Sequence, residues 1–136
     1  MSAKALQALL SDETAAESRV YAIRIPQRSE YPAITYQQIG GGALESANGG
    51  STTQDVLWQI VAHAETYAEA VELFDQVRVI LHGYRGTVGG VVVQHILIQD
   101  GSIRDLPNLT DDTEQLDRFA KSGDFRVMYE DTTPNP

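Results

Sequence analysis

The chain has 136 residues, a formal net charge of −9 at pH 7 and no cysteine. Its length suits a single domain that buries a core without covalent staples, and the lack of thiols excludes a disulfide framework, a cysteine nucleophile and a thiolate metal site. The acidic balance argues against a protein that holds nucleic acid through a basic surface. No stretch approaches the roughly 20 apolar residues needed to cross a bilayer, so no membrane contact is expected.

The first part of the chain predicts a short helix followed by two strands. Residues 3–10 carry leucines on one side of a helix that is too short to be stable unless it docks on the body. Residues 19–25 are rich in strand-forming side chains, and Pro26 ends the strand or moves it to a sheet edge. Residues 33–39 predict a second strand, and its closeness to the first suggests an antiparallel pair.

A glycine-rich stretch follows at residues 40–54 and is expected to be a long flexible loop. It holds five glycines and no lysine, so it lacks the G-K-[ST] sequence of a phosphate-binding Walker loop. A structureless stretch of this length in a small domain is usually functional or disordered. Two interpretations stay open, a mobile hairpin tip and an ordered binding arm.

The clearest signals are a strand at residues 55–64 and a helix at residues 66–83. The strand alternates apolar residues onto one face. Thr66 and Glu69 match a capping box at the helix start, and Gly83 suits the left-handed residue that follows a helix end. The apolar stripe of the helix comprises Ala70, Val71, Phe74, Val77 and Leu81. This stripe should pack against the face of the strand that carries Val56, Trp58, Ile60 and Ala62.

The remainder predicts a strand at residues 91–100, a helix at 111–123 with Leu116 and Phe119 inward, and a strand at 125–129. The fold class is therefore α+β, with a mostly antiparallel sheet of about five strands. One main helix (residues 66–82) and short N-terminal and C-terminal helices pack on it. A single domain spans residues 1–131, with the flexible loop at 40–54, and residues 132–136 form a disordered tail.

No catalytic motif is present, and no catalytic residue, cofactor or metal is expected. His63 and His95 lie on strands that could be neighbours, but ligand spacings such as H-x-H or H-E-x-x-H are missing. His82 lies at a helix C-terminus, where the helix dipole favours a cation. A small-molecule-binding or hydrolytic domain with His63 and His95 at its site remains an alternative interpretation.

Several short runs occur in an order that carries more information than any of them alone. After the N-terminal helix come Arg19-Val20-Tyr21, then Pro32-Ala33-Ile34-Thr35-Tyr36-Gln37, the glycine-rich stretch and Trp58. Thr66-Tyr67-Ala68-Glu69-Ala70 opens the main helix, and Gly123-Asp124-Phe125-Arg126-Val127 closes the pattern. From about residue 6 to residue 129, the chain resembles the tail completion proteins (tail terminator or tail-to-head joining proteins) of long-tailed bacteriophages and prophages.

The resemblance implies a structural protein of the virion and not an enzyme. Such proteins form a ring, typically of six copies, at the head-proximal end of the tail after assembly in the host cytoplasm. The implied partners are further copies of the chain, the tail tube protein and the head–tail connector protein. Genomic DNA would pass through the ring without specific binding, because an acidic ring repels phosphates. Another tail or connector component, such as a tube or head-closure protein, is the nearest alternative.

Exposure and mixed character suggest which residues would contact other subunits, the tube or the connector. Three arginines could pair with carboxylates of neighbouring subunits. The glycine-rich stretch could order on assembly at an entropic cost, and one face of the central strand mixes aliphatic and polar residues. The predicted interface residues are Arg19, Tyr21, Arg24, Arg28, Gly40, Gly41, Gly42, Leu44, Glu45, Asn48, Leu57, Gln59 and Val61.

Overall fold

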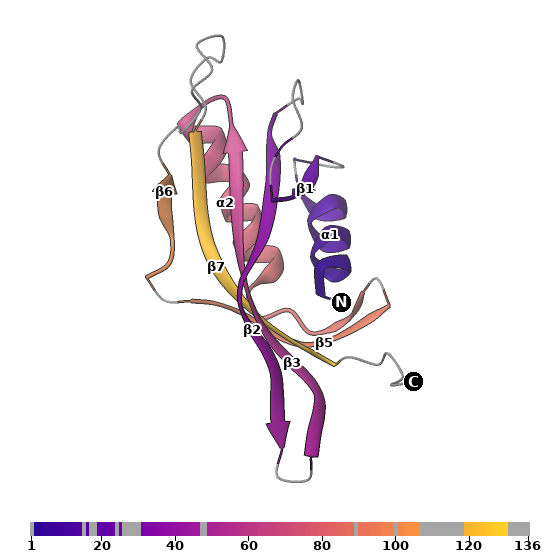
Figure 1. The fold of residues 1–136 in the computed structure, drawn as a ribbon. Helices are drawn as coiled ribbons and strands as arrows, with labels where there is room; N and C mark the ends of the chain where they lie inside the picture. Colours follow the sequence, from indigo (N-terminus) through magenta and orange to yellow (C-terminus); the bar gives the residue numbers. More distant parts are fainter. Residues whose placement is uncertain are drawn as a thin grey trace.

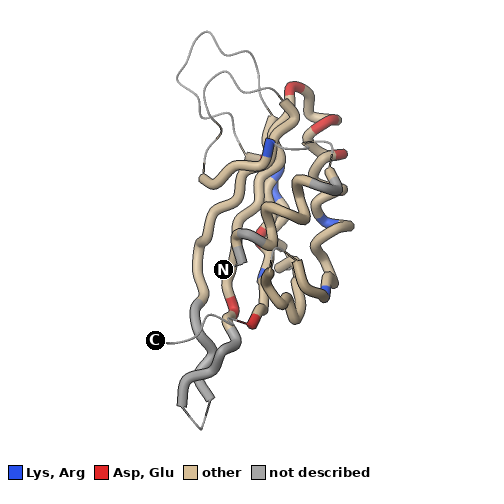
Figure 2. Tube along the Cα trace, turned by 90° about the vertical axis from the view of Figure 1, so that its right-hand side faces the viewer, with Lys and Arg blue, Asp and Glu red and all other residues tan. Residues whose placement is uncertain are grey.

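A computed structural model describes residues 2–14, 16, 19–23, 25, 31–46, 49–88, 90–99, 101–106 and 119–130. Its elements are α1 (Ser2–Glu13), β1 (Val20–Ala22), β2 (Ala33–Ser46), β3 (Gly49–Ala64), α2 (Tyr67–Leu81), β4 (Gly86–Val88), β5 (Val91–Ile98), β6 (Arg104–Leu106) and β7 (Phe119–Glu130). The strands form one sheet in the order β1-β2-β3-β7-β5-β4, with β6 also paired to β7. Both helices lie on one side of this sheet (Figure 2).

Helix α2 confirms the predicted main helix almost residue for residue. The Thr66 hydroxyl accepts a hydrogen bond from the Glu69 amide at 3.2 Å, which satisfies one of the unpaired donors of the first turn. The helix buries Ala70, Leu73, Phe74, Val77 and Leu81. Gly83 then adopts φ +84°, a left-handed conformation in which a glycine avoids the clash of a Cβ. The predicted member Val71 is only half-buried, and Leu73 takes its place in the stripe.

The core lies between the helices and the facing side of the sheet. The predicted alternation of the central strand is confirmed, because Val56, Trp58, Ile60 and Ala62 are all buried toward the helices. Helix α1 adds its leucines to the same cluster, so the short N-terminal helix docks as expected. The buried side chains that α1, β5 and β7 contribute to this cluster include Leu6, Leu10, Val93, Ile96, Phe125 and Val127.

Strand β7 is the centre of the sheet. It pairs along its whole length with β3, from Glu130 opposite Thr53 to Phe119 opposite Ala64, and its other side pairs first with β6 and then with β5. The helix predicted at residues 111–123 is wrong from Phe119 onward, where the chain is strand; residues 111–118 lie outside the described part. Ladder hydrogen bonds on both sides outweigh the weak strand preference of this segment.

The N-terminal strand also departs from the prediction. β1 has only three residues and pairs in parallel with β2, with Val20 opposite Ile34. Ile23 ends it with φ +71°, a conformation that is a genuine outlier for a β-branched residue. The expected antiparallel pair of longer strands is therefore wrong, and the sheet is mixed, with seven strands in place of about five.

Residues 40–46 and 49–54 form strand and not the predicted long loop. β2 continues to Ser46 and β3 begins at Gly49, with register shifts between Gln38 and Gly40 and between Ala43 and Glu45. Because β7 joins β3 only from Thr53, residues 44–46 and 49–52 form a two-stranded extension, which we call the ribbon. In Figure 1 the β2–β3 hairpin projects beyond the rest of the sheet.

Candidate functional site

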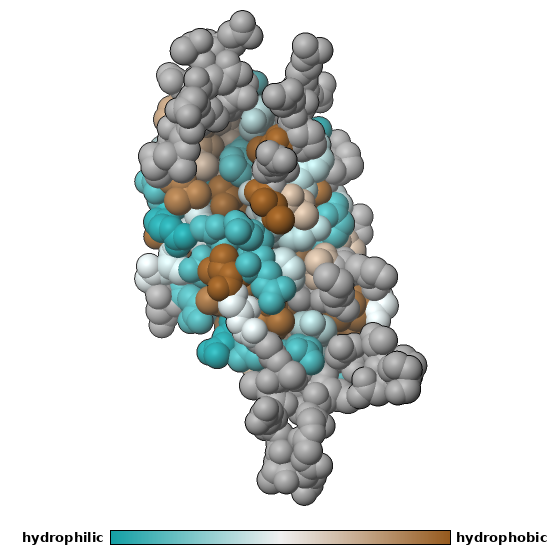
Figure 3. Space-filling model, in the orientation of Figure 1, coloured by the Kyte–Doolittle hydropathy of each residue, from teal (hydrophilic) through white to brown (hydrophobic). Residues whose placement is uncertain are grey.

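The side of the sheet away from the helices presents a mixed surface, which we call the outer face. Strand alternation places on it the residues that do not point into the core. Its members with at least partial exposure include Gln37, Leu57, Gln59, Leu97, Asp124 and Arg126. In Figure 3, which looks onto this side, hydrophobic patches are separated by hydrophilic surface. Such a mixture is typical of a protein contact surface.

One row of the outer face crosses three strands and alternates aliphatic and charged groups. The register places Leu57 opposite Arg126 and Arg126 opposite Leu97, whose side chain is 39% exposed. The guanidinium Nε of Arg126 donates to the Asp55 carboxylate at 3.0 Å. The local charge is thereby neutralised, so a partner can cover the two leucines without leaving an unpaired charge beneath it.

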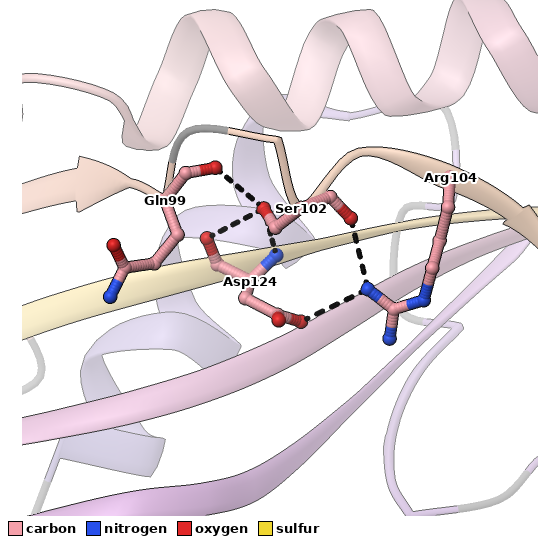
Figure 4. Close-up of polar contacts among 4 residues, drawn as sticks. All are labelled: Gln99, Ser102, Arg104 and Asp124. Atoms are coloured by element: carbon pink, nitrogen blue, oxygen red, sulfur yellow. Dashed lines mark hydrogen bonds and ion pairs between the residues drawn. The ribbon is translucent and has the colours of Figure 1, made fainter.

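A polar cluster fixes the connection between β5 and β6 onto β7 (Figure 4). The amide of Gln99 donates to the carbonyl of Asp124 at 2.8 Å. The Ser102 hydroxyl accepts from the Asp124 amide at 3.0 Å and donates to the Gln99 carbonyl at 2.7 Å. The Ser102 hydroxyl thus accepts the hydrogen bond from the Asp124 amide that a backbone carbonyl would accept in a continuous strand. β5 and β6 therefore pair with β7 as two parts of one interrupted strand.

The same cluster holds a second ion pair of the outer face. Arg104 Nη1 donates to the Ser102 carbonyl at 2.9 Å and lies 3.7 Å from Asp124 Oδ1. Next to it, Ile103 is 43% exposed. Sequence reasoning missed this cluster. A usable signal was the run Asp100-Gly101-Ser102, which is typical of a turn and separates two segments that pair with the same strand.

The structure brings some of the predicted interface residues together and separates others. Leu57 and Gln59 lie half-buried on the outer face, whereas Val61 is only 7% exposed and offers little surface. Arg19 Nε donates to the Pro32 carbonyl at 2.8 Å, so it helps to hold the connection into β2. Tyr21 is half-buried in β1.

The glycine-rich members of the predicted set lie on the hairpin. Gly40 follows the first register shift, which lies between Gln38 and Gly40, and Gly41, opposite Val56, has φ +98°. The backbone of Gly42, Leu44 and Glu45 belongs to β2. The remaining predicted residues, Arg24, Arg28 and Asn48, lie outside the described part of the chain. The predicted set is therefore divided between the outer face, the ribbon and the start of the sheet.

The shared site of His63 and His95 is not formed. His63 lies opposite Ala120 of β7 and His95 opposite Met128, so the two are eight positions apart along that strand. At ~3.4 Å per residue this separates them by about 27 Å. Within the described residues there is also no group of three or more histidines and carboxylates that could hold a metal ion.

His63 has a structural environment of its own. Its Nε2 lies 2.9 Å from the hydroxyl of Thr35, and burial lowers the pKa of the imidazole from 6.5 to about 4. The low pKa follows from the cost of moving a charged ring out of water. His63 is therefore neutral in the folded protein at neutral pH, as a hydrogen-bonded part of the sheet.

We predict that this histidine makes the protein lose stability in mild acid. The pKa of His63 is lower in the folded than in the unfolded protein. The contribution of the neutral imidazole to the free energy of unfolding is therefore complete above pH 6.5 and is lost as the pH falls toward 4. The expected loss between pH 7 and pH 4.5 is about 2–3 kcal/mol. Denaturant unfolding at both pH values should show a smaller loss for His63→Gln than for the wild type. Equal losses would contradict the assignment.

The sequence and the fold both match known proteins. The chain matches the family described as tail completion protein gp17 over residues 1–127. The chain belongs to this family. It is thus a structural protein of a phage tail and is associated with the virion. No curated protein matches the chain at a significant level.

A solved structure shares the fold of this family member. A chain from the virion of a native gene transfer agent particle aligns with a TM-score of 0.59 at 15% identity, covering 92% of this chain and 84% of that chain. In the part of the chain that is described, no helix is long and apolar enough to span a membrane. The match to the family model confirms the family resemblance that the order of the short runs indicated.

Proposed function

We propose that the chain forms a closed ring, with six copies as the expected number, at the head-proximal end of the tail tube. The ring ends tube polymerisation and offers the surface to which the head connector binds. Its role is structural and not catalytic. The observation that carries this proposal is the match to the tail completion family over residues 1–127.

The outer face supports the proposal physically. It presents leucines beside neutralised ion pairs, and Leu97 remains more than a third exposed. Exposed aliphatic side chains in a polar surrounding suit contact with another protein better than contact with bulk water. We infer that this face meets a neighbouring subunit, the tube or the connector.

The charge of the chain supports the passage of DNA. Each copy carries a net charge of −9, so a ring of several copies surrounds its axis with a strongly negative field. A genome that passes such a ring is repelled from its wall and does not bind to it. DNA therefore crosses the ring without a specific binding site. Under the same proposal, assembly of the ring with the other tail proteins takes place in the host cytoplasm.

The test is electron microscopy of tails assembled with and without this protein. We expect overlong tubes in its absence and tubes of uniform length when the wild type is supplied. Uniform tubes without the protein would contradict termination. A tube subunit would instead form long polymers by itself.

A matched pair of variants locates the contact. Leu97→Asp places a charge on the outer face, and Val79→Asp places the same charge on the solvent side of α2, where Val79 is 74% exposed. We expect Leu97→Asp to lose length control and Val79→Asp to retain it. Loss of control in both variants would remove the outer face from the proposal.

A further inference from the structure

One edge of the sheet is closed by the end of a helix. The Ile98 amide of β5 donates to Nδ1 of His82 at 3.2 Å, and the Gly83 amide donates to the Ile96 carbonyl at 2.7 Å. The imidazole of His82, at the end of α2, thus accepts a main-chain hydrogen bond from the edge strand. The first residues of β5 pair with β4. This edge therefore exposes few unpaired backbone groups to another strand.

The opposite edge is covered only at its start. β1 pairs with residues 34–36 of β2, and the Ile23 amide adds one bond to the Tyr36 carbonyl at 2.9 Å. There the unusual backbone of Ile23 ends the pairing. From residue 37 to residue 46, no strand of the described chain pairs with the outer side of β2. Ile23 and Ile39, 68% and 44% exposed, flank the start of this open edge.

The ribbon has a second open edge on its other strand. β7 pairs with β3 only from Thr53, so residues 49–52 have β2 as their single partner among the described strands. A two-stranded hairpin without further support is marginal in water. Among the strands that the structure describes, the ribbon thus carries two edges without a partner, and these edges run in opposite directions.

Rotation about a ring axis brings these two edges together. In a closed ring every copy points its ribbon the same way, so β2 of one copy lies beside β3 of the next and runs antiparallel to it. Closure removes both free edges at once. The charge pattern permits this approach, because residues 37–54 contain only one charged residue, Glu45, in a chain of net charge −9.

We propose that the ribbons of neighbouring copies pair edge to edge, β2 to β3, and close into an antiparallel barrel at the ring axis. The partner of the ribbon is therefore a second copy of this chain. This inference rests on the proposed ring and adds the contact through which copies recognise one another. Main-chain hydrogen bonds supply the affinity. Because β2 of one copy pairs with β3 of the next, all copies must point the same way around the ring.

The experiment is hydrogen exchange of the full chain, free and bound to tail tubes. We expect the backbone amides of residues 44–46 and 49–52 to exchange on the order of 100-fold more slowly in the ring than in the monomer. A ring whose ribbon amides exchange as in the monomer would overturn the barrel and leave the proposed function intact. If the wild type forms no ring on tubes, both proposals fail.

Two sets of variants complete the test. Replacing residues 44–53 by Asn-Gly leaves Ala43 opposite Gln54 and closes the hairpin with a favourable turn; we expect a folded monomer, with unchanged exchange in β5 and β7, that forms no ring. Thr52→Glu should weaken assembly at least tenfold, and the same change at the exposed Thr87 of β4 should not. Rings of normal affinity from the shortened chain would overturn the proposal.

Discussion

Replacing Gly123 by alanine is expected to lower the free energy of unfolding by about 3 kcal/mol, the upper part of the range for overpacking a core. A Cβ at this position would lie 2.5 Å from Cζ and 3.2 Å from Cε2 of Phe74. Phe74 is 1% exposed and packs against Phe125 with ring centroids 6.2 Å apart. A shift of the Phe74 ring away from the new Cβ would therefore disturb the packed core.

Chemical denaturation of three variants measures this effect. Gly40→Ala is the matched control, because a Cβ there meets only Leu57 at 3.9 Å, and we expect it to stay within about 0.5 kcal/mol of the wild type. In a Phe74→Leu background the cost of Gly123→Ala should fall by about half, since the clashing atoms are gone. An undiminished cost in that background would show that the backbone, and not Phe74, requires the glycine.

Replacing Gly41 by alanine is expected to cost about 3 kcal/mol as well, through strain of the backbone and a clash with it. Gly41 has φ +98°, and a Cβ would overlap the carbonyl oxygen of Asp55 and lie 2.5 Å from Cα of Val56. Both atoms belong to the paired strand, so relief requires that β2 and β3 separate. We expect faster amide exchange from residue 42 to residue 54, together with weaker ring assembly.

A second glycine separates strain from clash in this experiment. Gly90 has φ +77°, but a Cβ on this residue would meet no atom within 4 Å, so Gly90→Ala should cost only about 1 kcal/mol. Amide exchange in the hairpin should be unchanged in this control. Equal effects of the two substitutions would mean that backbone conformation alone decides the cost at Gly41.

The elements that sequence predicted well are those whose signals are local. Helix α2 has a cap, an apolar stripe and a terminal glycine within eighteen residues, and each signal agrees with the others. The alternation of Val56, Trp58, Ile60 and Ala62 also reflects one neighbouring helix face. These local signals predict the fold correctly because the side chains that produce the pattern are the ones that are buried in the core.

The elements that sequence missed depend on distant partners. Residues 119–124 become strand because β3 and β6 pair with them on either side. The glycine-rich residues become strand because they pair with each other across a hairpin, with irregular register. The parallel pairing of β1 has no local signal at all, since it depends on the path of the chain between Ala22 and Ala33.

The candidate interface was predicted in part for the same reason. Leu57 and Gln59 could be assigned to the outer face by alternation alone. Leu97, Arg126 and the Ser102–Asp124 cluster could not, because their proximity follows from the order of strands in the sheet. Alternation with a two-residue period places Val61 on the outer face and does not predict that it is buried.

The central position of β7 has a consequence for the order of folding. This strand follows β3 and β5 in the chain yet separates them in the sheet. During synthesis, β3 can pair with β2 and β5 with β4, but neither can pair with the neighbour that they share until residues 119–130 have left the ribosome. Pairing of distant segments is slow and leaves strand edges exposed in the meantime. A newly made chain therefore lacks the centre of its sheet, and keeps the facing edges of β3 and β5 open, until this strand has emerged.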